Sequence, residues 1–411
     1  MTKKSDAPAI RFKGFSDAWE QRKFGEVFDC TVPNNTLSRA ELSYDEGTVL
    51  NVHYGDVLIK YGSVLDVQKD DIPRIPHRCR EDFNGALLQD GDVIIADTAE
   101  DETTGKACEI SNLQGSVIVS GLHTMVCRPR NRMALGYLGY YLNSNAYHHQ
   151  LLPLMQGIKV LSLSRSNIQK TSVSYPIAVK EQQLIAYYFS QLDNLITLHQ
   201  RKCALLFSPF QALISMMFTT STFSWEQRKL GDIADIVGGG TPSTGNQSYW
   251  DGDIDWYAPA EIADQIYANS SQKKITGLGY ENSSAKMLPP GTVLFTSRAG
   301  IGKTAILTRK GCTNQGFQSI VPHRGELDSY FIFSRTEELK RYGELVGAGS
   351  TFVEVSGKQM AVMELMMPPT MREQQTIGGF FQQLDHLITL HQRELEKLQN
   401  IKKSMLEKMF V

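Results

Sequence analysis

Two stretches of the chain repeat each other: EQQLIAYYFSQLDNLITLHQRK at residues 181–202 and EQQTIGGFFQQLDHLITLHQRE at residues 373–394. Fifteen of the 22 positions are identical, at an offset of 192 residues. Apolar residues recur in both at alternating spacings of four and three, which is the heptad seam of a coiled coil. We expect these seam positions to make the spacer or partner contacts: Leu192, Ile196, His199, Leu384, Ile388 and His391.

Two such helices in one chain most simply pack on each other, and a twofold relation between the repeats makes them antiparallel. At about 1.5 Å per residue, each helix forms a rod of up to ~57 Å. The rod is a spacer between two domains, or alternatively a coiled coil that joins two copies of the chain. His199 and His391 share one heptad position and are expected to be polar seam groups rather than metal ligands. Pro209 should kink or end the first helix nearby.

A second repeat shows that whole domains are duplicated. Residues 19–29 read WEQRKFGEVFD and residues 225–235 read WEQRKLGDIAD, with seven of eleven positions identical. Each unit then spans roughly 190–200 residues, too long for a solenoid repeat. We expect a first domain at 1–180, a helix at 181–218, a linker and second domain at 219–372, and a second helix at 373–411.

The interiors of the two copies correspond only in scattered places. A common frame with different interiors suggests one scaffold that presents two recognition surfaces, although ordinary drift of loops after duplication remains the alternative. Strand patterns at 48–53, 91–96, 116–119 and 291–296, with helical patterns at 135–142 and 329–345, predict α/β domains with curled β-sheets.

Composition narrows the class of protein. The net charge of −2 over 411 residues excludes a highly basic nucleic-acid coat protein but not a local basic groove. The six cysteines lie at no zinc spacing, so we expect reduced thiols and no metal. The first residues lack the apolar core of a signal peptide, and no run of 18 apolar residues occurs. We therefore expect a cytoplasmic protein without a membrane partner.

One stretch, 299–304, reads AGIGKT and ends like a phosphate-binding loop. The full pattern needs glycine five residues before Gly302, where Ser297 stands, and strand-like residues follow instead of a helix. We interpret it as a glycine hairpin that carries Arg298 and Lys303 outward. A nucleotide hydrolase ranks last among the alternatives, and no other catalytic motif occurs, so we predict no enzyme activity and no catalytic residue.

Basic, polar and aromatic residues flank the glycine turns, and such side chains contact base edges or phosphates in DNA grooves. The predicted DNA-binding residues are Tyr54, Lys60, Tyr61, Lys106, His123, Lys159, Trp256, Arg298, Lys303, Gln315 and Thr351.

Together these motifs resemble the specificity subunit of bacterial type I restriction–modification systems, over essentially the whole chain. The WEQRK openings and the EQQ helices are typical of that family. The stretch GGGTPS at 238–243 is similar to a widespread class of target recognition domain, and QGIK at 156–159 and GAGST at 347–351 match the turn before its final strand. The stretch 207–210, FSPF, departs from the charged helical run that is usual there.

The resemblance implies two target recognition domains that each read one half of a split double-stranded DNA site, held apart by the helices. It also implies two methyltransferase (M) subunits and motor–nuclease (R) subunits as partners. The partners supply S-adenosylmethionine, ATP and Mg, while this chain binds no cofactor of its own. A duplicated scaffold that joins protein partners without DNA is the rival from another class.

Overall fold

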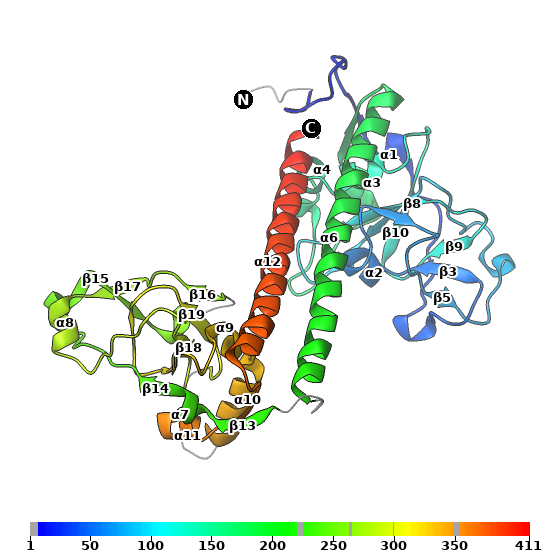
Figure 1. Ribbon diagram of the computed structural model, residues 1–411. Helices are drawn as coiled ribbons and strands as arrows, with labels where there is room; N and C mark the ends of the chain where they lie inside the picture. Colours follow the sequence, from blue (N-terminus) through cyan, green and yellow to red (C-terminus); the bar gives the residue numbers. More distant parts are fainter. Residues whose placement is uncertain (1–6, 220–224, 263–264, 299, 348–353) are drawn as a thin grey trace. The chain divides into compact units, whose positions relative to one another are not determined.

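A computed structural model describes residues 7–219, 225–262, 265–298, 300–347 and 354–411, and its chain divides into two units (Figure 1). Unit 1 comprises Met1–Arg201 and Gln392–Val411, and unit 2 comprises Lys202–His391. Unit 2 is therefore inserted in the chain of unit 1. Among the described residues, no helix has the length and apolar character needed to cross a membrane.

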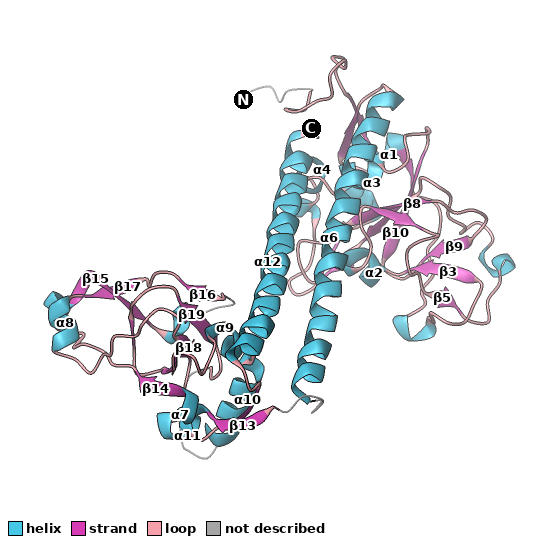
Figure 2. Cartoon of the chain, in the orientation of Figure 1, coloured by secondary structure: helices cyan, strands magenta, loops and turns pink. Residues whose placement is uncertain are grey.

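Unit 1 contains a five-stranded sheet, a three-stranded sheet and two short ribbons (Figure 2). The five-stranded sheet has the order β2 (Phe28–Asp29), β10 (Thr124–Pro129), β6 (Val93–Ala96), β8 (Ala107–Ser111), β4 (Val64–Asp66). The three-stranded sheet has the order β5 (Arg74–Ile75), β3 (Val49–Val52), β9 (Val117–Ser120). The ribbons pair β1 (Glu20–Lys23) with β12 (Ser172–Tyr175), and β7 (Thr98–Ala99) with β11 (Leu161–Ser162). The short helices are α1 (Phe24–Val27), α2 (Tyr54–Ile59), α3 (Tyr137–Leu142), α4 (Asn145–His148) and α5 (Arg165–Ile168).

The described residues of unit 2 repeat this topology except for the β7–β11 ribbon, in whose place an isolated bridge pairs Arg298 with Glu354. Its five-stranded sheet has the order β14 (Ala234–Gly238), β21 (Gln318–Pro322), β18 (Val293–Phe295), β19 (Thr304–Leu307), β16 (Tyr267–Ala268). Its three-stranded sheet has the order β17 (Lys273–Ile275), β15 (Trp250–Tyr257), β20 (Cys312–Thr313), and β13 (Glu226–Lys229) pairs with β22 (Glu364–Met367). The short helices are α7 (Leu230–Ile233), α8 (Gly277–Glu281), α9 (Ser329–Ser334), α10 (Thr336–Gly347) and α11 (Gly357–Ala361).

The strand directions agree as well as the order. The edge pair of the large sheet is parallel in each unit, β4–β8 in unit 1 and β16–β19 in unit 2. One pair of the small sheet is parallel as well, β3–β9 and β15–β20. At the centre of the large sheet, β6–β8 and β18–β19 are antiparallel. The sheets are mixed and open. The predicted strands 48–53, 91–96, 116–119 and 291–296 all lie within or around strands of this frame.

The long helices are α6 (Val179–Thr219) and α12 (Met371–Lys408). α6 runs through Pro209 to Thr219, so the helix does not end there, while a kink at Pro209 stays a prediction. The helical pattern at 329–345 is two helices rather than one, since Arg335 separates α9 from α10.

The glutamines of the EQQ motif join each long helix to its own unit. The side chain of Gln182 accepts a hydrogen bond from the Ala134 amide and donates one to the Pro176 carbonyl. Gln374 does the same with the Asp328 amide and the Glu326 carbonyl. Both glutamines are buried, so these bonds are shielded from water and fix where each helix begins.

Within unit 1, the last part of α12 packs antiparallel on α6. The aromatic rings of Phe189 and Phe410 stack with centroids 5.7 Å apart. Further along α6, Asp193 pairs with Lys402, and His199 lies 3.4 Å from Glu394. Along α6 the residue numbers rise from 189 to 199, while those of the contacting residues fall from 410 to 394, as antiparallel helices require. Of the predicted seam residues, Leu192 and Ile388 are buried, whereas Ile196, His199, Leu384 and His391 are half-buried.

Candidate nucleic-acid interface

Three loops meet at one edge of unit 1. They are the turn after β6 (97–106), the turn before β10 (121–123) and the hairpin that leads through β11 (156–163). The amide of Asp97 donates to the His123 carbonyl at 3.1 Å, and the amide of Leu163 donates to the Asp97 carbonyl at 2.8 Å. These backbone bonds hold the three loops together, and we call this place the three-loop edge.

Unit 2 builds the same edge from loops whose sequences differ, apart from Gly302 and Lys303, which stand where unit 1 has Gly105 and Lys106. The Ser297 amide donates to the Gly316 carbonyl at 2.8 Å, and the Val355 amide donates to the Ser297 carbonyl at 3.0 Å. The third loop is described only from Glu354 onward. Gly105 and Gly302 stand at equivalent places before β8 and β19, and both have φ above +90°, a conformation that other residues rarely adopt.

The glycines of the 238–243 stretch form a tight wall in unit 2. A Cβ on Gly239 would lie 1.9 Å from the Asn314 carbonyl oxygen, and one on Gly240 would lie 2.3 Å from the Ser284 hydroxyl oxygen. Only glycine lets the backbone come so close to the 313–316 turn at Gly239 and to Ser284 at Gly240. The Gly240 amide also donates to the Thr313 carbonyl at 2.8 Å, so the wall and the turn form one rigid piece.

Three of the predicted residues of unit 2 meet at this edge. Arg298 donates to the backbone carbonyl of Gln315 at 2.6 Å and lies 3.4 Å from the Glu354 carboxylate. The Gln315 side chain is exposed. Lys303, which lies with Arg298 on the hairpin between β18 and β19, is exposed as well. β19 follows Lys303 as an antiparallel partner of β18, which confirms a hairpin in place of a phosphate-binding loop.

The predicted residues of unit 1 are less concentrated. Tyr54 contacts His123 edge-to-face at 5.3 Å, and His123 lies 3.6 Å from Asp97, so these two belong to the edge. Lys159 is exposed on the 156–163 hairpin. Lys60 pairs with Asp71 at 2.7 Å. Lys106 donates to the Leu58 carbonyl at 2.8 Å, and burial lowers its pKa.

Two predicted residues are corrected by their burial, and one lies outside the described residues. Tyr61 belongs to the core around β3 and β9, and burial raises its pKa. Trp256 is buried near the end of β15, the central strand of the small sheet of unit 2, and donates to the Gly240 carbonyl at 2.8 Å. Neither side chain reaches the surface, so we assign both to the cores. Thr351 falls in the stretch that is not described.

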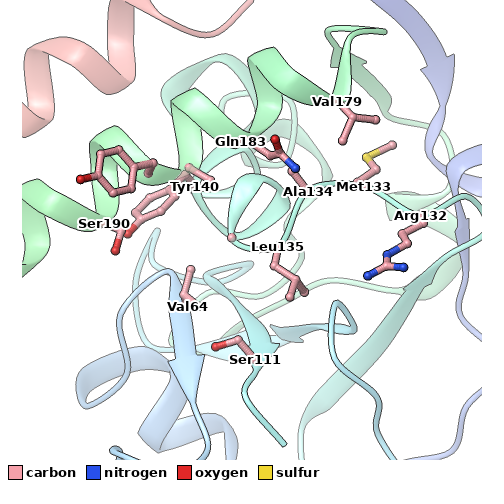
Figure 3. A pocket seen from close by; sticks show the side chains of 13 residues that line it. Val64, Ser111, Arg132, Met133, Ala134, Leu135, Tyr140, Val179, Gln183 and Ser190 are labelled. Atoms are coloured by element: carbon pink, nitrogen blue, oxygen red, sulfur yellow. The ribbon is translucent and has the colours of Figure 1, made fainter.

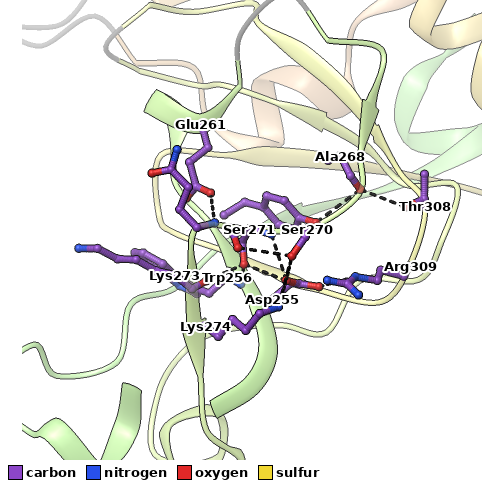
Figure 4. Close-up of polar contacts among 12 residues, drawn as sticks. Asp255, Trp256, Glu261, Ala268, Ser270, Ser271, Lys273, Lys274, Thr308 and Arg309 are labelled. Atoms are coloured by element: carbon purple, nitrogen blue, oxygen red, sulfur yellow. Dashed lines mark hydrogen bonds and ion pairs between the residues drawn. The ribbon is translucent and has the colours of Figure 1, made fainter. Parts of the chain in front are cut away.

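Sequence reasoning missed a polar cluster around Asp255 on β15 (Figure 4). The buried carboxylate accepts from Lys274 and from the amide and hydroxyl of Ser271, and it pairs with Arg309 at 2.6 Å. Burial alone would raise the pKa of Asp255, but these donors outweigh it and lower the pKa to about 2. The cluster ties β15 to the turn before β17 and to the turn after β19, contacts too distant in sequence to be read from it.

A groove of about 740 Å³ opens in unit 1 between the 132–136 loop and the first turns of α6 (Figure 3). Leu135, Val179 and Tyr187 give it an apolar lining, and Arg132 is the charged side chain among its lining residues. The Tyr140 hydroxyl donates to Asp193, and burial raises the pKa of Tyr140. Among the described residues that line the groove, none is a histidine, aspartate, glutamate, lysine or cysteine.

A comparison of the sequence with models of protein families identifies the family of this duplicated chain. The model described as "type I restriction modification DNA specificity domain" matches twice, at residues 16–206 and 224–400. The chain belongs to this family. It carries two specificity domains, and each match begins just before a WEQRK motif and ends within a long helix.

Named relatives agree with the family. The chain is 34% identical over 190 residues to the type I restriction enzyme MjaIX specificity subunit of Methanocaldococcus jannaschii, which is 46% of this chain and 44% of that protein. The chain thus spans less than half the length of this relative. It is 23% identical over 416 residues, 94% of this chain and 92% of the relative, to the putative MjaX specificity subunit of the same organism.

A solved structure of a type I S subunit has a similar fold. The type I restriction–modification S subunit from M. genitalium has a TM-score of 0.60 to this chain at 13% identity, over 98% of this chain and 99% of that one. At this identity the likeness supports the fold alone.

Proposed function

We propose that this chain is the non-catalytic DNA-recognition subunit of a type I restriction–modification complex and that it reads a bipartite target, one half-site per specificity domain. The observation that carries the proposal is the contrast at the three-loop edge. Two units with the same strand order and direction present different side chains there: Arg298 and Gln315 in one, His123 and Lys159 in the other, with an exposed Lys303 where unit 1 has the half-buried Lys106. Different side chains on a common frame suit two different base sequences.

The proposal requires the two half-sites to be a fixed distance apart. Half-sites read from one face of the duplex are about 34 Å apart, or multiples of it. Helices of 41 and 38 residues are long enough to set such a gap. We infer that α6 and α12 form the antiparallel coiled-coil spacer, with the contacts in unit 1 as its described part.

Partner subunits are inferred to dock on the long helices. The most similar stretch of the two repeats leaves leucines exposed at equivalent positions, Leu195 and Leu198 in unit 1 and Leu387 and Leu390 in unit 2. Exposed apolar side chains repeated on both helices fit two copies of one partner. The methyltransferase subunits would bind there, supply S-adenosylmethionine and flip the target adenine for N6 methylation, with ATP-dependent restriction left to the R subunits.

The primary test is the distribution of N6-methyladenine across the host genome, with and without this gene. We expect a split motif that vanishes on deletion and returns with the plasmid-borne gene. A methylome that is unchanged by deletion would contradict the DNA-recognition role and favour the scaffold alternative.

The partner sites can be tested separately by native mass spectrometry of the complex with the host methyltransferase subunit. Leu195→Asp with Leu198→Asp should remove one methyltransferase copy, and adding Leu387→Asp with Leu390→Asp should remove both. Leu345→Asp is the matched control, because Leu345 is 77% exposed but lies on α10. Two copies retained by the fourfold variant would overturn this docking surface.

A further inference from the structure

We propose that Gln315 reads a base in the second half-site, with adenine in the major groove as its partner, and that Thr241 positions it. The inference rests on the proposed function and names a specificity-determining residue for it. Gln315 lies at the tip of the turn between β20 and β21, and its side chain is exposed at the three-loop edge.

The backbone under Gln315 is fixed from several sides. The Asn314 amide donates to the Tyr257 carbonyl at 3.0 Å, and the Gly316 amide donates to the Asn314 side chain at 2.7 Å. Arg298 donates to the carbonyl of Gln315 itself at 2.6 Å. A turn held in this way does not have to be ordered when DNA arrives, so its side chain is presented at little entropic cost.

The side chain of Gln315 is also oriented. The Thr241 hydroxyl donates a hydrogen bond to the Gln315 Oε1 atom. Thr241 reaches that position because Gly239 lets the backbone pack directly on the 313–316 turn and Gly240 lets it pack on Ser284 and Ala285. This contact explains the GGGTPS stretch: the glycines form the wall, and the threonine at its end orients the amide.

The remaining hydrogen-bonding capacity of the amide selects the base. Thr241 occupies one lone pair of Oε1, which leaves a second lone pair and both Nε2 hydrogens. An acceptor beside a donor on one planar group matches the N6 amino group and N7 of adenine, the bidentate pairing that glutamine makes in the major groove. Lys303, exposed on the neighbouring hairpin, is placed to contact phosphate.

The experiment measures methylation rates by the assembled complex on short duplexes. The wild-type motif is first read from the host methylome, and each base pair of both half-sites is then replaced in turn. Gln315→Ala should lose discrimination at one adenine-containing pair of the second half-site, by on the order of 10- to 100-fold. Discrimination at the first half-site should stay unchanged and serves as the internal control.

Three further variants separate base reading from a structural defect. Thr241→Val should weaken discrimination at the same base pair, and Thr241→Ser, which keeps the hydroxyl, should restore it. Gln272→Ala changes an exposed glutamine beside the Asp255 cluster and should have no effect. Unchanged discrimination in Gln315→Ala, or an equal loss at every pair of both half-sites, would overturn the proposal. Either result leaves the wild-type motif, and so the proposed function, intact.

Discussion

Unit 1 places charged groups inside its large sheet where unit 2 has uncharged ones. Val93 on β6 lies opposite Glu109, and its counterpart Val293 on β18 lies opposite Ile306. Glu109 and Ile306 therefore occupy the same place. Both are buried, yet one carries a carboxyl group and the other a hydrocarbon side chain.

The difference is explained by how each unit caps its next helix. In unit 1, Glu109 reaches from β8 and accepts the amides of Gly136 and Gly139 at 2.8 Å, at the start of α3. In unit 2, the first amides of α9 are accepted by Asp328, the residue directly before that helix. The helix start needs an acceptor in both units, but the acceptor comes from a distant strand in one and from the neighbouring residue in the other.

The largest effect should come from exchanging these two residues. Ile306→Glu buries a carboxylate where Asp328 has already taken the amides of Tyr330 and Phe331, so unit 2 should lose about 3–5 kcal/mol. Glu109→Ile leaves two buried amides without an acceptor and should cost unit 1 about 2–4 kcal/mol. Hydrogen exchange followed by mass spectrometry reports each unit separately. If neither variant lowered the hydrogen-exchange protection of its own unit relative to the wild type, the two sites would not be equivalent.

A second exchange concerns the ion pair between Asp92 and Arg128, which is absent at the equivalent residues Thr292 and Val321. Both oxygens of the buried Asp92 carboxylate accept from Arg128, at 2.7 and 2.8 Å. Arg128→Val alone leaves that carboxylate without its cation and should destabilise unit 1 by about 3 kcal/mol. The double variant Asp92→Thr with Arg128→Val copies unit 2 and should recover most of the loss. A double variant as unstable as the single one would show that the frame does not tolerate the exchange.

The two units should also respond to pH in opposite directions. Burial raises the pKa of Glu109 to about 7, despite the hydrogen bonds from Gly139 and Gly136. Glu109 therefore makes its full contribution to the stability of unit 1 below its ordinary pKa of 4.5. As the pH rises through 7, unit 1 loses about 3 kcal/mol of that stability. Asp255 contributes above its ordinary pKa of 3.8, and its contribution is lost as the pH falls toward 2.

Hydrogen exchange at pH 5 and pH 8 tests the prediction for Glu109, once the rates are corrected for the pH dependence of amide exchange itself. Unit 1 should be better protected at pH 5, and Glu109→Gln should remove most of that difference. An identical pH dependence in the variant would assign it to another group.

The smallest expected effect concerns the surface charges of the edges. Unit 2 exposes Lys303 on its hairpin, whereas the matching turn of unit 1 half-buries the equivalent Lys106 and exposes Glu100, Asp101 and Glu102. Lys303→Ala should weaken binding of the assembled complex uniformly across second half-site sequences and reduce the log–log salt slope by about one. Binding that depends on the first half-site should not change, and a loss shared by both half-sites would contradict separate readers.

The sequence predicted the frame because its signals are local. The apolar run at 93–96 and the heptad positions of the long helices are periodic, and both lie where expected. Glu109, Asp255 and Arg128 could not be predicted, because their partners are brought together only by strand pairing. Tyr61 and Trp256 show the opposite error: aromatic residues beside glycine turns were expected at the surface, but they fill the cores.

The insertion of unit 2 within unit 1 has a consequence for synthesis on the ribosome. Phe189 has its partner Phe410 only after Lys202–His391 have been translated. At 5–20 residues per second, that delay lasts roughly 10–40 s. Unit 2 has all its residues before unit 1 does, so the half that begins first is finished last. During that interval the apolar face of α6 stays uncovered, and a nascent chain in that state is a natural client for a chaperone.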